Sequence, residues 1–263
     1  MASVTALQPG AMLSTGDALR LEGVSRSFGA LKAVEDVSIS VAAGERRAVI
    51  GANGAGKTTL FNVITGDYAA SAGRVRFFGE DVTAHPPYER IRAGMRRTYQ
   101  SSLLFRNLTV RDNLFLAVRG VSRGQFGFLR FGLDSVSVRA TQEILDRVRL
   151  TAVGDEPVAS LSHGQQRQLE IGMALAGAPR LILFDEPAAG LSPAERRELV
   201  ALLAALPAHM SFILIEHDLE IALRVVDRVT VMHNGRILKE GTPAEIENDP
   251  EVQEIYMGRA GHA

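Results

Sequence analysis

The stretch GANGAGKTT, residues 51–59, constrains the fold of this chain more than any other part of its sequence. It matches the pattern G-x-x-x-x-G-K-[ST], follows the apolar run ERRAVI, and leads into KTTLFNVIT. The run predicts a strand and the second segment a helix, which Gly66 is well placed to end. We therefore expect an α/β core built around a strand–turn–helix unit.

This turn predicts a binding site for nucleotide phosphates. Glycines let the backbone approach phosphate oxygens, so the N–H groups from Asn53 to Thr58 would point inward, and the helix N-terminus adds partial positive charge. Lys57 would bridge the outer phosphates and the Thr58 hydroxyl would ligate Mg²⁺. The alternative, a glycine-rich turn with an incidental lysine, leaves the strand–turn–helix context unexplained. The expected nucleotide-binding residues of the turn are Gly51, Ala52, Asn53, Gly54, Ala55, Gly56, Lys57, Thr58 and Thr59.

A second chemical signal is LILFDEP, residues 181–187, where an apolar strand ends in two acids. Burying adjacent carboxylates is costly unless a cation compensates them. Asp185 is placed to hold the Mg²⁺ shell, and Glu186, on the other side of the strand, to polarise an attacking water as a general base. The structural alternative is a strand followed by an acidic turn and a helix-breaking proline.

The segment LSHGQQ, residues 161–166, predicts the start of a helix. Ser162 and Gln165 have the spacing of a capping box, and that interpretation is physically sufficient on its own. The N–H groups that follow Ser162 also form a helix N-terminus that favours an anion. Because the phosphates of the same chain already have a binding turn, this second set of donors would serve a phosphate held by another molecule.

Elsewhere the chain alternates strands with helices, which favours a mainly parallel, doubly wound sheet. Residues 100–159 look different and predict an inserted helical subdomain that includes a Gly/Phe-rich connection around residues 120–132. Asn234-Gly235 is the strongest hairpin signal. We expect residues 1–17 to form a flexible tail and residues 18–263 to form the folded domain.

Composition narrows the possible functions. A net charge of −1 gives no basic field for nonspecific binding of nucleic acid, so no nucleic-acid partner is expected. With no cysteine there is no disulfide framework and no thiolate zinc site. The sequence contains no window of about 18 uninterrupted apolar residues, so no membrane span is expected. The N-terminus lacks the pattern of a secretory signal.

Taken together, GANGAGKTT, Gln100, LSHGQQ, LILFDEP, AGLSPAE and His217 resemble, in order and spacing, the ATP-binding subunits of ABC transporters. The resemblance covers about residues 19–258. It implies a P-loop NTPase core with a mainly parallel sheet, a small antiparallel β subdomain and an inserted helical subdomain. It also implies two subunits facing head to tail, with ATP and Mg²⁺ between the phosphate turn of one and the LSHGQQ helix of the other.

The resemblance assigns further roles residue by residue. Phe28 matches an aromatic that stacks on adenine, although it could instead be a core phenylalanine. Gln100 matches a glutamine that contacts Mg²⁺ or its water and senses the membrane partner, and is otherwise a solvated residue. His217 matches a histidine that touches the γ-phosphate and orients water, and is otherwise a histidine at a strand end. The catalytic set implied is Glu186, His217 and Gln100, and the metal set is Thr58, Gln100 and Asp185.

The segment that would bind phosphate in trans is Ser162, His163, Gly164 and Gln165. His163 departs from the glycine most common there. AGLSPAE matches a loop that links the two sites across the dimer, yet Ser192 and Pro193 also start a helix well, and Asp218 is expected to cap another. Gly172-Met173 replaces a common Ala-Arg and is expected to alter packing against the helical subdomain.

The ending GRILKEGTPAEIENDPEVQEIYMG and the tract TTLFNVITGDY are most similar to ATPases of branched-chain amino acid importers. Relatives that import urea or amides, and lipopolysaccharide exporters, stay open as alternatives. A nucleic-acid-associated ATPase and a nonhydrolysing regulatory module fit less well. The implied partners are an identical or paralogous ATPase subunit, transmembrane permease subunits and an extracytoplasmic solute-binding protein. The implied location is peripheral, on the cytoplasmic face of the cell membrane.

Overall fold

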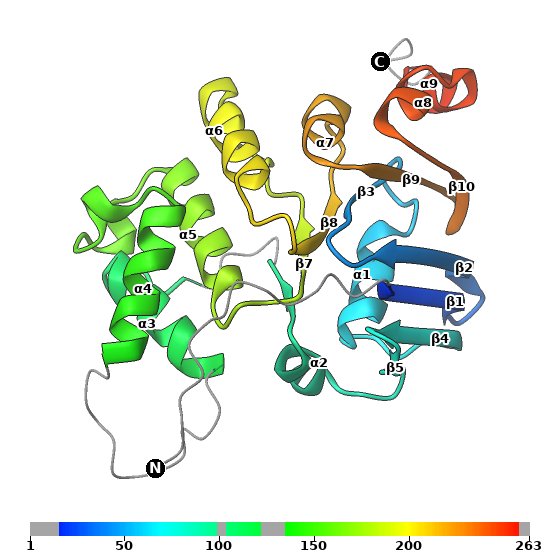
Figure 1. The fold of residues 1–263 in the computed structure, drawn as a ribbon. Coiled ribbons are helices and arrows are strands. Elements are labelled where there is room, and N and C mark those ends of the chain that lie inside the picture. Colours follow the sequence, from blue (N-terminus) through cyan, green and yellow to red (C-terminus); the bar gives the residue numbers. More distant parts are fainter. Residues whose placement is uncertain (1–15, 99–103, 122–134, 258–263) are drawn as a thin grey trace.

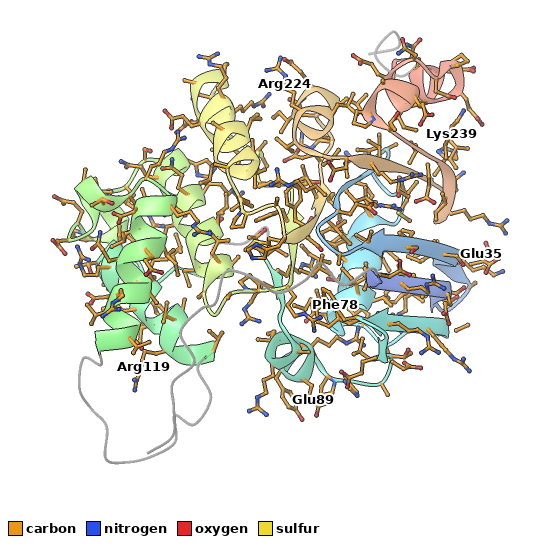
Figure 2. All side chains as sticks on the ribbon, in the orientation of Figure 1. Glu35, Phe78, Glu89, Arg119, Arg224 and Lys239 are labelled. Carbon is orange, nitrogen blue, oxygen red and sulfur yellow. The ribbon has the colours of Figure 1, made fainter. Side chains whose placement is uncertain are left out.

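The computed structural model describes residues 16–98, 104–121 and 135–257. Two sheets and a helical block make up the fold (Figure 1). Helices α3, α4 and α5 lie together at one side, and the antiparallel sheet lies at the other. Charged side chains such as Arg224 and Lys239 extend outward from the ribbon (Figure 2).

The central sheet has six strands in the order β10-β9-β3-β8-β7-β6. All neighbouring pairs are parallel except β9 and β10, which form an antiparallel hairpin. Its strands are β3 (Arg46–Ile50), β6 (Met95–Arg97), β7 (Leu181–Asp185), β8 (Ser211–Ile215), β9 (Arg228–His233) and β10 (Arg236–Gly241). The carboxyl ends of β3, β7 and β8 therefore meet at one edge, where Gly51, Glu186 and Glu216 follow directly.

The second sheet is antiparallel, in the order β2-β1-β4-β5. Its strands are β1 (Asp17–Phe28), β2 (Leu31–Ala42), β4 (Ala72–Phe77) and β5 (Glu80–Asp81). β1 extends beyond the strand expected from about Leu19 to Val24, because register shifts around Gly23 let it continue past the broken alternation. Asp17 begins β1, and residues 1–15 of the expected tail lie outside the described residues.

Nine α-helices are described in residues 16–98, 104–121 and 135–257. They are α1 (Lys57–Thr65), α2 (Pro87–Ala93), α3 (Val110–Val121), α4 (Ser135–Arg147), α5 (His163–Leu175), α6 (Pro193–Ala204), α7 (Leu219–Val225), α8 (Pro243–Glu247) and α9 (Pro250–Met257). Two short 3₁₀ turns, η1 (Thr151–Val153) and η2 (Val158–Ser160), connect α4 to α5.

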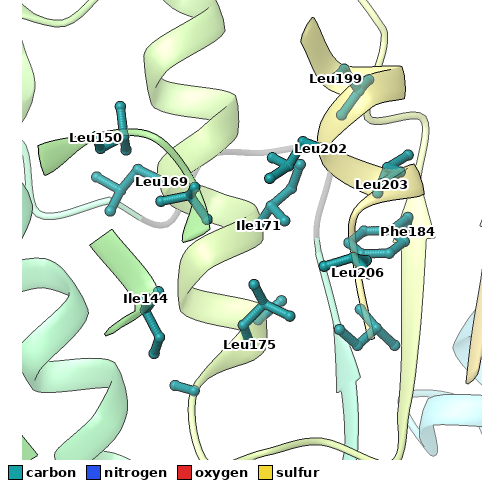
Figure 3. Close-up of a cluster of buried hydrophobic side chains, with 14 of the residues drawn as sticks. Ile144, Leu150, Leu169, Ile171, Leu175, Phe184, Leu199, Leu202, Leu203 and Leu206 are labelled. Carbon is teal, nitrogen blue, oxygen red and sulfur yellow. The ribbon is translucent and has the colours of Figure 1, made fainter. Parts of the chain in front are cut away.

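Helix α5 joins the helical block to the α/β core. Leu169, Ile171 and Leu175 belong to one buried cluster that reaches Ile144 of α4 on one side and Phe184 of β7 on the other (Figure 3). A Cβ on Gly172 would lie only 3.0 Å from the Leu114 side chain, so the glycine allows α5 close to α3. The predicted helical subdomain, residues 100–159, does not include α5, whereas α5 packs against both the helical block and the α/β core.

The expected fold class is confirmed: a mainly parallel sheet, an antiparallel sheet and a helical block are all present. The Asn234-Gly235 hairpin is confirmed too, with φ values of 48° and 78°, which suit a two-residue turn with both residues left-handed. Gly66 ends α1 with φ 85°, as expected. Most of the Gly/Phe-rich stretch at residues 120–132 lies outside the described residues.

Candidate functional site

A cleft of about 570 Å³ opens at the carboxyl end of β3. Its lining combines the turn from Asn53 to Thr59 with Glu186 and with Leu31–Ala33 of β2. The structure thus brings together the phosphate turn and one of the acids expected beside it. The residues Ser162–Gln165 do not line this cleft.

Glycine is required by geometry at two positions of the turn. A Cβ on Gly51 would lie 2.4 Å from the Met232 carbonyl oxygen, closer than any real contact. Gly56 has φ 98°, and its Cβ would lie 2.3 Å from the Ala33 carbonyl oxygen. The turn is therefore pressed against β9 and β2, and this packing holds its N–H groups in a fixed arrangement.

Lys57 is buried at the base of this turn. Its Nζ donates to the carbonyl oxygens of Gly51, at 2.8 Å, and Ala52, at 3.1 Å. Burial lowers the pKa of Lys57, while the Glu186 and Asp185 carboxylates oppose that shift. Both carboxylates therefore lie close enough to the Lys57 ammonium group to stabilise its charge.

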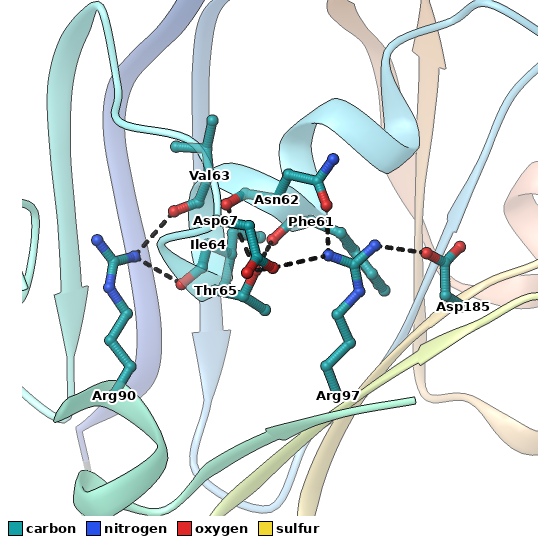
Figure 4. A network of polar contacts seen from close by, with 9 residues as sticks. All are labelled: Phe61, Asn62, Val63, Ile64, Thr65, Asp67, Arg90, Arg97 and Asp185. Atoms are coloured by element: carbon teal, nitrogen blue, oxygen red, sulfur yellow. Dashed lines mark hydrogen bonds and ion pairs between the residues drawn. The ribbon is translucent and has the colours of Figure 1, made fainter. Parts of the chain in front are cut away.

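Asp185, at the end of β7, is only 1% exposed and pairs with Arg97 at 2.7 Å. Arg97 lies on β6, the parallel neighbour of β7, and also binds Asn62 and Asp67 (Figure 4). The second carboxylate oxygen of Asp185, Oδ1, is buried without a hydrogen-bond partner. Arg97 thus supplies one cationic partner for Asp185, and Oδ1 of Asp185 stays available to a second cation.

Glu186 and His217 follow neighbouring strands and approach each other. The Nδ1 atom of His217 lies 3.9 Å from Oε2 of Glu186, and the imidazole is 55% exposed. Glu186 has φ 48°, a left-handed conformation that is unusual for a non-glycine residue and marks a constrained position. The side chain of Glu186 is turned toward the phosphate cleft, which it helps to line.

Phe28 is 41% exposed, so the alternative of a core phenylalanine is wrong. Its ring packs edge-on against Tyr68, with centroids 5.4 Å apart, and the Arg26 guanidinium lies 4.6 Å from the ring centroid. Phe28 is not among the residues that line the phosphate cleft, but β2 residues just beyond its hairpin are. Part of the Phe28 side chain therefore remains accessible from solvent.

The capping box predicted for LSHGQQ is confirmed. Ser162 Oγ accepts from the Gln165 N–H at 3.2 Å, and Gln165 Oε1 accepts from the Ser162 N–H at 2.9 Å. The Gly164 N–H, expected as a free donor, instead donates to Oε1 of Glu195 at 2.9 Å. The Glu195 carboxylate, in the first turn of α6, therefore occupies the position at the start of α5 where another anion would bind.

AGLSPAE does start a helix, as the structural interpretation predicted. Ser192 and Glu195 form a capping box, and N–H donors of Ser192 and Gly164 contribute to keeping the pKa of Glu195 below its usual value. His163 lies against the same loop, with Nε2 3.4 Å from the Ala189 carbonyl oxygen. Asp218 caps α7 as expected, through the Ile221 N–H at 3.3 Å.

Sequence reasoning missed three buried or bridging partners: Arg97, Glu195 and Glu216. Glu216 is completely buried at the end of β8, directly before His217. The rule that singled out Asp185 and Glu186, an apolar strand ending in acids, also applies to FILIEHD and would have found Glu216. Gln100 falls outside the described residues.

In the part of the chain that the structure describes, no group of three or more His, Cys, Asp or Glu side chains is arranged to hold a metal ion. Across the described segments, no helix has both the length and the apolar character needed to cross a bilayer.

Comparisons with known proteins agree on one family. A family profile described as "ABC transporter" matches residues 34–189, and one described as "Branched-chain amino acid ATP-binding cassette transporter" matches residues 237–262. The chain is 36% identical to the high-affinity branched-chain amino acid transport ATP-binding protein BraF of Pseudomonas aeruginosa, over 92% of this chain and 98% of that protein. It is 37% identical to the corresponding LivG protein of Escherichia coli K12, with the same coverage.

Solved structures give the same result. The chain is similar to a crystal structure of the ADP conformation of an ATP-binding cassette of an ABC transporter, with a TM-score of 0.82 and 36% identity. The match covers 93% of this chain and all of that one. A nucleotide-free ATP-binding cassette matches with a TM-score of 0.81 at 36% identity, over 91% of this chain and 98% of that one.

Proposed function

The chain belongs to the ABC transporter ATP-binding proteins of the branched-chain amino acid type, and on that premise we propose that two such subunits close around shared ATP to drive uptake. Members of this family bind and hydrolyse ATP, and this chain is such an ATPase subunit of an importer. The proposal concerns how its residues do so and what they assemble with.

ATP would occupy the cleft at the end of β3. The backbone N–H groups from Asn53 to Thr58 would receive the phosphates, and Lys57 would leave the Gly51 and Ala52 carbonyls to bind the outer two. Phe28 would offer its exposed face to adenine. The close packing of Gly51 and Gly56 against β9 and β2 supports this part of the proposal, because it holds the turn in one arrangement.

Mg²⁺ fits the donor set beside the cleft. The partnerless Oδ1 of Asp185 and the Thr58 hydroxyl are hard oxygen donors, and Gln100 completes the set implied by the resemblance. When bound, the ion neutralises charge on the phosphate oxygens. Arg97 holds the other oxygen of Asp185, so the carboxylate is oriented before any metal arrives.

Hydrolysis would use Glu186 and His217. Glu186 lines the phosphate cleft and is placed to accept a proton from the attacking water. His217 lies beside it with a largely exposed imidazole, able to reach both the water and a γ-phosphate once the site closes. Both side chains follow adjacent parallel strands, so their relative position is set by the sheet.

The observation that carries the dimer proposal is the separation of the two anion-binding elements within one chain. Ser162–Gln165 do not line the phosphate cleft of their own subunit. These residues would meet the γ-phosphate bound to a second subunit, identical or paralogous, with Glu195 released from the Gly164 N–H on closure. A single helix end contributes only about 0.3–2 kcal/mol, so closure needs ATP to bridge both surfaces.

The remaining partners follow from the family. We place the ATPase pair beneath transmembrane permease subunits on the cytoplasmic face of the cell membrane, with an extracytoplasmic solute-binding protein delivering the solute. The names of the BraF and LivG relatives favour branched-chain amino acids over urea, amides or lipopolysaccharide.

The test is the Glu186→Gln variant saturated with Mg·ATP. We expect it to bind ATP, to lose turnover, and to accumulate a dimer measurable by size-exclusion chromatography with light scattering. Lys57→Ala is the matched control, since it should stay monomeric for lack of bound phosphate. Undiminished turnover would refute the role of Glu186, and a monomer at saturating ATP, even with the membrane subunits present, would refute the shared site.

A further inference from the structure

Glu216 is a buried carboxyl that the proposed mechanism does not use. It directly follows the last residue of β8, Ile215, and is 0% exposed. Its Oε1 accepts a hydrogen bond from the Ala188 N–H at 2.8 Å. Its Oε2 has no hydrogen-bond partner and lies 4.0 Å from Nδ1 of His217, just beyond bonding distance.

The Ala188 contact fixes the turn that carries Glu186. The Glu186 N–H donates to the Ile215 carbonyl at 3.0 Å, and the Ala189 N–H donates to the Glu186 carbonyl at 3.1 Å. Between these two bonds Glu186 has φ 48°, which a non-glycine residue keeps only when its surroundings impose it. The Glu216 side chain is the third contact that holds this turn in shape.

A carboxyl kept only for structure would be expected to have both oxygens paired. Both oxygens of Glu195, for comparison, are paired, since they accept from the Gly164 and Ser192 N–H groups. A fully buried oxygen without a partner is costly, and such atoms are rare in folded proteins. The ionisable group that approaches Oε2 of Glu216 is the His217 imidazole, with Nδ1 at 4.0 Å.

We propose that Glu216 is a positioning residue for ATP hydrolysis, which holds the Glu186 turn through Ala188 and orients His217 through a hydrogen bond between Oε2 and Nδ1. The inference rests on the roles proposed above for Glu186 and His217. It adds that one buried side chain, that of Glu216, orients both the general base Glu186 and His217.

The proton balance of the pair is consistent with that role. Burial raises the pKa of Glu216, and the Glu186 and Asp218 carboxylates act in the same direction; the Ala188 N–H and His217 act against it. Asp218 is itself paired with Arg196 at 2.9 Å. A proton shared as the Glu216 O–H that donates to Nδ1 of His217 leaves the imidazole hydrogen on Nε2, which can then donate to a γ-phosphate.

Loss of that shared proton changes the donor pattern. The carboxylate would then accept from Nδ1–H of a neutral imidazole, and Nε2 would turn into an acceptor facing phosphate. Hydrolysis by the wild-type chain should therefore fall on the alkaline side of its pH profile. In Glu216→Gln the amide carbonyl can keep the Ala188 bond while its NH₂ donates to Nδ1, with no proton to lose.

The experiment measures the pH dependence of kcat for Mg·ATP hydrolysis by the full-length chain. We expect Glu216→Gln to keep wild-type kcat within about threefold at neutral pH, and its alkaline fall to move up by at least one pH unit or vanish. Glu216→Ala should lose about 100-fold in kcat with little change in KM, because the general base is misplaced while the phosphate turn is intact. Glu220→Gln, an exposed acid on α7, is the control and should match wild type.

Two outcomes would overturn the inference. One is a Glu216→Gln profile that superimposes on that of wild type, and the other is a folded Glu216→Ala chain with unchanged kcat. Thermal unfolding and binding of a fluorescent ATP analogue establish that each variant is folded and loaded. The Glu186→Gln variant distinguishes failure of the proposed mechanism from failure of the Glu216 inference. If Glu186→Gln hydrolyses ATP normally, the proposed mechanism fails. If Glu186→Gln is inactive and the Glu216 variants behave as wild type, only the inference fails.

Discussion

The Arg97 guanidinium lies 2.7 Å from the Asp185 carboxylate, and both side chains are almost completely buried between neighbouring parallel strands. The pair is separated by 88 positions in the sequence. Its consequence is that the acid at the end of β7 has a cationic partner and a fixed orientation without a bound metal, while Oδ1 stays open.

Removing Arg97 should destabilise the fold. In Arg97→Ala the Asp185 carboxylate would be buried without a cation, and we expect the free energy of unfolding to fall by about 3 kcal/mol, as for other broken buried pairs. Urea denaturation measures the change. The exposed pair of Arg20 and Asp17 provides the control, since Arg20→Ala should cost at most about 0.5 kcal/mol. Adding Asp185→Asn to Arg97→Ala should recover part of the loss; a purely additive cycle would contradict the pairing.

Lys57 predicts a pH dependence of stability. Burial lowers its pKa in the folded chain below the value of 10.5 that it has when exposed. Between the two pKa values the unfolded chain binds more protons, so stability gains from this residue as pH rises through that window. The free energy of unfolding of the wild type should therefore rise relative to that of Lys57→Met as the pH increases toward 10.5. A difference between the two unfolding free energies that does not change with pH would show that Lys57 has the same pKa in the folded and unfolded chains.

Ser162 should have a role beyond capping. Ser162→Ala is expected to cost about 1 kcal/mol in unfolding free energy, as for other N-cap serines, and also to weaken the ATP-dependent dimer of the Glu186→Gln background. Thr242 caps α8 with the same capping-box geometry, so Thr242→Ala is a matched control for stability. If both variants reduce dimerisation equally, Ser162 acts only as a cap.

Phe28 should affect nucleotide affinity without affecting stability. Its ring is exposed, and stacking of a base on an aromatic is worth about 1–3 kcal/mol. We expect Phe28→Ala to raise the Kd for ATP about tenfold, and Phe28→Tyr to keep it near that of the wild type. Tyr88→Ala, at another exposed aromatic, should leave the Kd unchanged. Titration with a fluorescent ATP analogue measures the Kd of each variant. Equal Kd values for Phe28→Ala and wild type would exclude stacking.

The sequence by itself determined the features that depend on short stretches. The phosphate turn, the Asn234-Gly235 hairpin and the Ser162–Gln165 capping box each involve residues only a few positions apart, so local pattern and backbone geometry suffice to predict them. Parallel strands separated by helices were predictable for the same reason, and with them the edge at which Gly51 and Glu186 meet.

Only the tertiary structure decided which distant partners those residues find. Arg97 reaches Asp185, Glu195 reaches Gly164 and Glu216 reaches Ala188 across separations of 88, 31 and 28 positions. Each contact depends on strand order and on how α5 and α6 pack. No local pattern specifies these, because the sheet and the hydrophobic clusters fix the relative positions of segments that are far apart in the sequence.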